Sequence, residues 1–146
     1  MRFVLHTRVS QTPDVVFPVF GDASFVESLT PRLMGLEILK IGLQLGDEIS
    51  VRFKGLGPRG AWISKIVELE RSDAAIWFVD RSVETPWPFA SVQHRHGFVA
   101  DGTGTLLVDD VTFSGRPRIM GPLVYPLLRW SFGFRRHVYR QRFGAG

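Results

Sequence analysis

The chain has 146 residues, of which 45% are hydrophobic and 22% charged, a balance that fits one globular domain and excludes a disordered tail protein. It contains no cysteine, which excludes disulfides and thiolate metal sites. The formal net charge is +4, but residues 1–115 carry 11 basic and 14 acidic side chains, whereas residues 116–146 carry seven arginines and no acidic residue. The basic character therefore belongs to the C-terminal segment alone.

The N-terminal residues MRFVLHTRVS alternate polar and apolar side chains, which predicts a strand over residues 2–9. They lack the continuous apolar core of a signal peptide, and no uncharged stretch approaches the about 20 residues of a membrane span. We therefore expect a cytoplasmic protein. Thr12-Pro13 is typical of a helix start, and a short helix is predicted from there to Gly21, with another before Thr30-Pro31.

Six further strands are predicted between residues 36 and 114, because runs rich in β-branched and aromatic residues alternate with glycine-containing turns. Asp101-Gly102-Thr103-Gly104 is a strong hairpin signal between the last two of them. The predicted strands cover residues 36–41, 47–54, 61–70, 74–83, 89–100 and 105–114.

Residues 119–143 change to a helical period. The side predicted to pack on the sheet carries Met120, Leu123, Val124, Leu127, Ser131, Phe134 and Val138. Arg129, Arg136 and Arg140 fall opposite, flanked by Arg135 and Arg142. A run of charge usually forms a solvated face, and the alternative is a weak contact with an anionic surface through Arg129, Arg136 and Arg140.

These elements together predict an α+β fold. A curved antiparallel sheet of about seven strands can bury its inner face by wrapping around the long C-terminal helix, with two short helices after the first strand. Such an arrangement favours an apolar cleft between helix and sheet. We expect residues 1–146 to form one domain, present as a monomer or a homodimer.

Several short motifs, in this order and spacing, carry a family resemblance over about residues 2–143. They are Pro13 with Val16-Phe17, Leu29-Thr30-Pro31, Gly46-Asp47, Trp62-Ile63-Ser64, Phe78-Val79-Asp80, His94-Arg95-His96-Gly97-Phe98, and Gly104-Thr105 to Asp109 with Val111. The chain resembles the START-like, polyketide-cyclase (SRPBCC, helix-grip) superfamily, and most nearly its bacterial ligand-binding SRPBCC proteins. The sequence departs from the family at Thr85-Pro86-Trp87-Pro88-Phe89 and at Val92. The resemblance implies a START-like domain that holds a small apolar molecule, such as a lipid, a polyketide-like compound or an aromatic compound.

His94 and His96 are two residues apart on a predicted strand, so they share one face with Val92 and Phe98. We expect this drier face to look into the cleft, where Asp80 and Asp109 on other strands can reach the histidines. The residues suit a satisfied buried hydrogen-bond network that orients a ligand. Acid–base chemistry by a histidine–aspartate pair is an alternative. Two histidines and a carboxylate also form a metal-ligand set, but His-x-His alone is a weak signal and no metal is expected.

Large aromatic residues form a second group of candidates, and they are either core or cavity lining. Trp62 and Trp87 are the better cavity candidates, because an indole N–H can also bind a ligand oxygen. The predicted ligand-binding residues are Trp62, Phe78, Asp80, Trp87, His94, His96, Asp109 and Phe134.

Two functions stay open at the level of sequence. The first is binding of a small apolar molecule in the cavity between sheet and helix. The alternative is a cyclase/aromatase or hydrolase-like enzyme that uses a His–Asp pair in the same cavity. The chain has no dinucleotide fingerprint, phosphate loop or nucleophile elbow, so we expect no cofactor. We do not expect a nucleic-acid partner.

Overall fold

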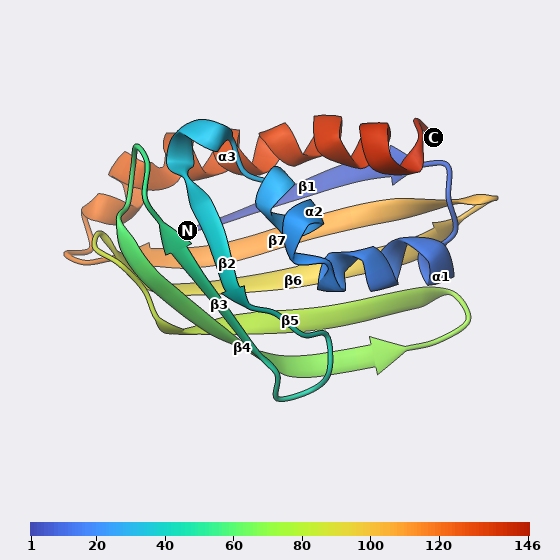
Figure 1. The fold of residues 1–146 in the computed structure, drawn as a ribbon, viewed down its shortest axis with the longest axis horizontal. Coiled ribbons are helices and arrows are strands. Elements are labelled where there is room, and N and C mark those ends of the chain that lie inside the picture. The colour runs from blue at the N-terminus through green and yellow to red at the C-terminus, as the bar shows by residue number, and fades with distance from the viewer.

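The computed structural model describes residues 1–146. Seven antiparallel strands form one sheet in the order β1-β7-β6-β5-β4-β3-β2 (Figure 1). The strands are β1 (Arg2–Val9), β2 (Leu36–Lys40), β3 (Glu48–Phe53), β4 (Gly60–Arg71), β5 (Ala75–Glu84), β6 (Phe89–Asp101) and β7 (Gly104–Gly115). Four short helical segments connect β1 to β2: α1 (Pro13–Val16), η1 (Phe17–Gly21), α2 (Ala23–Ser28) and η2 (Arg32–Met34). The long helix α3 spans Met120–Phe143.

The helix α3 runs along the β1 edge of the sheet and contacts β1 and β7, while α1 and α2 cover the same face farther along (Figure 1). This arrangement produces two buried apolar clusters. One lies under α1, α2 and the C-terminal end of α3, around Phe20, Phe98 and Tyr139. The other lies under the N-terminal half of α3, around Phe89, Phe113 and Leu128. None of the helices combines the length and the apolarity that crossing a bilayer requires.

The predicted order of elements is confirmed. The alternation of polar and apolar residues specifies the strands where one face is buried; in β1 every second residue, from Phe3 to Val9, is buried. The tight Asp101-Gly102 turn joins β6 and β7, where Gly102 has a φ of 60° that favours glycine.

The predicted packing face of α3 is only partly correct: Val124 and Ser131 are buried as predicted, but the buried face is rotated by about one residue, roughly 100°. The buried positions are Gly121, Val124, Leu128, Ser131, Tyr139 and Phe143. Leu127 is exposed, Phe134 and Val138 are only partly buried, and Arg135 lies inward rather than on the solvated side. The error has a physical cause: the inward face includes polar Ser131 and Arg135, while the outward face carries apolar Leu123 and Trp130.

Two adjacent leucines distinguish the observed orientation of α3 from the orientation that the sequence predicted. Leu128 is 6% exposed and Leu127 is 36% exposed. Leu128→Ala is expected to lower the free energy of unfolding by about 2–5 kcal/mol, because it leaves a hole in the packed cluster. Leu127→Ala should cost less than about 1 kcal/mol, as a partly solvated position does. Urea unfolding of the two variants measures both values, and equal losses would contradict the described helix face.

Candidate functional site

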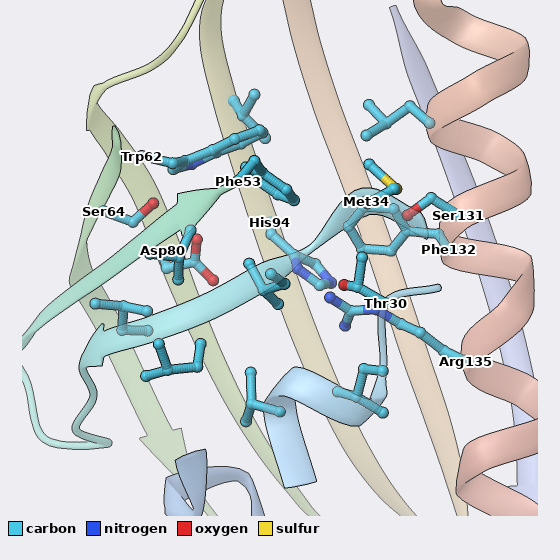
Figure 2. A pocket seen from close by; sticks show the side chains of 18 of the residues that line it. Thr30, Met34, Phe53, Trp62, Ser64, Asp80, His94, Ser131, Phe132 and Arg135 are labelled. Atoms are coloured by element: carbon cyan, nitrogen blue, oxygen red, sulfur yellow. The ribbon is translucent and has the colours of Figure 1, made fainter. Parts of the chain in front are cut away.

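A cavity of about 160 Å³ lies between the sheet, α3 and the segment from α2 to β3, and it adjoins both apolar clusters. Of its 26 lining residues, 18 are hydrophobic, so most of a bound molecule would contact carbon. One wall consists of aliphatic residues from β2 and β3 that the sequence analysis did not select: Leu36, Ile38, Ile49 and Val51. Figure 2 shows polar side chains of the lining, including Asp80, His94 and Arg135, gathered on the sheet and on α3.

His94 and His96 lie on β6, are buried and line the cavity. Their rings pack against each other with centroids 3.5 Å apart, and the ring of His96 also stacks on Phe78 at 4.0 Å. Each histidine bonds a carboxylate on a neighbouring strand: Nε2 of His94 lies 2.9 Å from Asp109 on β7, and Nε2 of His96 lies 2.6 Å from Asp80 on β5. In both cases the bond is diagonal, because Asp109 is directly opposite His96, and Asp80 is opposite His94.

Asp109 is the centre of a buried polar network behind the cavity wall. Its Oδ1 accepts from Nη1 of Arg135 at 3.1 Å, and its Oδ2 accepts from the Tyr139 hydroxyl at 3.1 Å. Burial raises the pKa of the Asp109 carboxyl, but the Arg135 charge and the His94 bond more than offset this, so the pKa lies below its ordinary range. Asp109 is therefore ionised at neutral pH, and its charge is balanced by that of Arg135.

Arg135 is the residue that the sequence analysis assigned to the wrong side of the helix. It lines the cavity, and its guanidinium carbon lies 4.2 Å from the centre of the Phe132 ring. Figure 2 shows its side chain reaching from α3 toward His94. Only Nη1 has protein partners, namely Asp109 and Tyr139, so Nε and Nη2 keep donors for another group.

The two carboxylates determine which nitrogens of the histidines face a ligand. Burial, together with the charge of Arg135 and the neighbouring His96, lowers the pKa of His94 to about 4. Because an ionised carboxylate only accepts, the neutral His94 must carry its proton on Nε2, which leaves an acceptor lone pair on Nδ1. Nδ1 of His96 is buried and has no hydrogen-bond partner in the protein. Burial raises the pKa of Asp80, but the bond from His96 and the charges of the two histidines and Arg135 together more than offset this, so the pKa is lowered.

This arrangement makes stability depend on pH. The ordinary pKa of His94 is 6.5 and its folded value is about 4. Between these values the unfolded chain binds more protons than the folded one, so stability falls as the pH decreases. We expect His94 to remove about 3 kcal/mol of unfolding free energy between pH 6.5 and pH 4. His94→Gln should lack this contribution, and urea unfolding of both proteins across that range measures it; identical pH profiles would contradict the prediction.

The other predicted site residues divide into two groups. Trp62, Phe78 and Asp80 line the cavity with the two histidines, and Asp109 lies behind His94. Trp87 does not line the cavity: it lies in the β5–β6 turn, where its side chain is exposed. Phe134 is also outside the lining, because the orientation of α3 turns Arg135 inward in its place. A polar series at helical spacing, Ser131, Arg135 and Tyr139, could have identified that inward face.

The group Asp80, His94 and His96 has ligand atoms within 4.8 Å of one another, a set that suits a divalent metal in composition. The Arg135 guanidinium reaches the same cavity from α3 and opposes a cation there. In addition, one nitrogen of each histidine is already bonded to a carboxylate. The arrangement therefore fits a hydrogen-bonding site better than a metal centre.

No protein-family model matches the chain, and no curated protein matches it in sequence. Among solved structures, protein Ms6760 from Mycobacterium smegmatis aligns with a TM-score of 0.72 at 11% identity, covering 99% of this chain and 91% of that one. The Zhui aromatase/cyclase from Streptomyces sp. R1128 aligns with a TM-score of 0.65 at 18% identity, covering 97% and 95%. Norcoclaurine synthase from Thalictrum flavum, solved with dopamine and hydroxybenzaldehyde, gives 0.59 at 16% identity, covering 94% and 87%. The chain therefore has the helix-grip fold of these proteins, as its resemblance to the SRPBCC superfamily predicts.

Proposed function

We propose that the protein binds a small, mainly apolar molecule in this cavity, with a hydroxyl or carbonyl group of the ligand against His94, His96 and Arg135. The observation that carries the proposal is the combination of an apolar lining with unpaired polar atoms at one place. Nδ1 of His96 has no partner, and Arg135 keeps free donors. Buried polar groups are normally paired, so the buried Nδ1 of His96 indicates a missing partner, and Arg135 can donate to the same ligand.

The polar atoms also indicate which head group suits the cavity. A hydroxyl can donate to the lone pair on Nδ1 of His94 and at the same time accept from Arg135. A carboxylate can also accept from Arg135, but the ionised Asp80 lines the same cavity and would repel its charge. Polyketide-like and phenolic molecules combine an apolar body with hydroxyl and carbonyl groups, and lipids with an alcohol head share this chemistry. Those are the ligand classes that we propose.

Native mass spectrometry of protein purified from its own host, followed by organic extraction, tests the proposal. We expect an added mass of the size of a small organic molecule or a lipid, and we expect to recover that molecule in the organic phase. The matched variant is Ser64→Phe, which fills the cavity and should carry no such mass. The proposal would be contradicted if protein purified from its own host carried no ligand and also did not bind 2-naphthol in solution.

An enzyme of the cyclase/aromatase or hydrolase type is the second candidate, favoured by the Asp109–His94 pair with its free Nδ1. A general base works best with a pKa near the operating pH, and the pKa of His94 is about 4. That value favours binding over proton abstraction. If the His94 titration measured by NMR moves toward neutral pH when a ligand is bound, and the ligand is converted, the catalytic alternative is correct.

A further inference from the structure

Several exposed apolar side chains gather at the end of the molecule where α3 begins. Leu33 in η2 is 64% exposed and Leu56 in the β3–β4 turn is 69% exposed. The two are neighbours, since the backbone N–H of Leu56 donates to the carbonyl of Leu33. Leu123, Leu127 and Trp130 lie on the outward side of α3. We call these five residues the apolar patch.

The segments of the apolar patch lie close to one another. A side chain at Gly57, next to Leu56, would lie 3.7 Å from Leu127 and 4.0 Å from Met34, next to Leu33. Figure 1 shows η2, the β3–β4 turn and the first half of α3 at one end of the molecule. Single exposed leucines are ordinary on a monomer, but a contiguous group marks an interaction surface.

Basic residues surround the apolar patch. Arg32 adjoins Leu33, Arg59 lies at the end of the β3–β4 turn, and Arg116 and Arg118 precede α3. All four side chains are exposed, and none forms an ion pair with a carboxylate. Residues 30–35, 54–60 and 115–130 contain no acidic residue. The surface therefore presents apolar side chains inside a positively charged border.

The apolar patch also adjoins the cavity. Leu127 belongs to both, because it lines the cavity and is exposed at the surface. Met34, which is next to Leu33, and Pro58, which lies in the β3–β4 turn, also line the cavity. A molecule leaving the cavity beside Leu127 would enter whatever covers the patch.

We propose that this face docks on a lipid bilayer that contains anionic phospholipid. Leucine and tryptophan side chains among arginines are the composition of a surface that lies at the bilayer interface. Anionic headgroups complement the four arginines. A second copy of the chain would bring the same positive charges and be repelled, and nucleic acid offers no apolar layer for the leucines. The proposal extends the proposed function, since an apolar ligand could pass between bilayer and cavity without crossing water.

Co-sedimentation with vesicles tests the docking face. We expect binding to phosphatidylcholine vesicles that contain phosphatidylglycerol, and little binding to phosphatidylcholine alone. Leu56→Asp should weaken binding about tenfold or more, because a charge replaces an inserted leucine. The matched control is Leu45→Asp, which adds the same charge at a leucine 65% exposed in the β2–β3 loop, at the other end of β3. Arg118→Gln should weaken binding and reduce its salt dependence, whereas Arg140→Gln, at the far end of α3, should change it little.

Two outcomes would overturn the docking proposal. One is no sedimentation with phosphatidylglycerol vesicles at low ionic strength. The other is a dimer in solution that Leu56→Asp dissociates, which would assign the patch to a second copy. Solution binding of 2-naphthol separates this proposal from the proposed function: Leu56→Asp should bind the probe as the unmodified protein does, and failure to bind the probe with vesicle docking intact would contradict only the proposed function.

Discussion

Replacement of Arg135 by methionine is expected to lower the free energy of unfolding by about 3–5 kcal/mol, because it leaves the buried carboxylate of Asp109 without its balancing charge. Methionine keeps much of the apolar length of the side chain, so the loss reports the charge rather than a hole. The pKa of Asp109 should rise in the variant, since the Arg135 charge is the first influence that lowers it. Urea unfolding at neutral pH measures the loss.

Two further variants make this result specific. Arg136→Met changes the neighbouring arginine, which is exposed and bonds only the His6 carbonyl at 3.3 Å, and should cost less than about 1 kcal/mol. Asp109→Asn combined with Arg135→Met removes both charges and should be more stable than Arg135→Met alone. Equal losses for Arg135→Met and Arg136→Met would mean that the ion pair contributes nothing, contrary to its burial.

Filling the cavity should abolish ligand binding. Ser64 is buried on β4 and lines the cavity, so the ring of Ser64→Phe would occupy the space of a ligand. We expect about a hundredfold or greater loss of affinity for the fluorescent probe 2-naphthol. The stability of the variant should change by no more than about 1–3 kcal/mol, as for other small-to-large substitutions.

The control for Ser64→Phe lies on the same strand. Val67 is on the outward side of β4, and Val67→Phe adds a ring that does not enter the cavity. It should bind 2-naphthol as the unmodified protein does. If Ser64→Phe binds the probe equally well, the probe lies elsewhere on the molecule.

The strands could be predicted from the sequence alone, because a half-buried strand must alternate apolar and polar residues. A shift of one residue would turn every side chain to the other face of the sheet. The same rule placed His94 and His96 on the inner face, because Val92 and Phe98 share it and both are buried. The sheet register then brings Asp80 and Asp109 to the histidines. Predicting the two His–Asp pairs required only the alternation of side chains along each strand and an antiparallel sheet.

The orientation of α3 could not be predicted from hydrophobicity. The helix has an apolar outward side, with Leu123, Leu127 and Trp130, and an inward side on which Ser131 and Arg135 interrupt the apolar residues. A helical wheel that ranks the faces of α3 by hydrophobicity therefore selects a face between the inward and the outward side. The polar series Ser131, Arg135 and Tyr139 marks the inward face in the sequence, but its partner, the buried carboxylate of Asp109, is brought there by the tertiary structure.

The cavity wall from β2 and β3 was missed for a different reason. Leu36 and Ile38, and likewise Ile49 and Val51, alternate along their strands as ordinary core residues do. They line a cavity because β2 and β3 lie at the edge of the sheet farthest from β1, so that α3, which contacts β1 and β7, leaves the space beneath them open. Candidate residues chosen for their aromatic or polar chemistry could not include them.

Nitrogen NMR of the histidine side chains with 2-naphthol and with naphthalene tests the central claim most directly. In the free protein, Nδ1 of His94 should be the unprotonated nitrogen at neutral pH. Added 2-naphthol should shift the Nδ1 resonance as its hydroxyl donates to the lone pair, whereas naphthalene should enter the cavity without this shift. His94→Gln, which can keep a donor toward Asp109 but lacks Nδ1, should lose the preference for 2-naphthol over naphthalene. Unchanged His94 and His96 resonances at saturating 2-naphthol would contradict the proposed polar contact within the cavity.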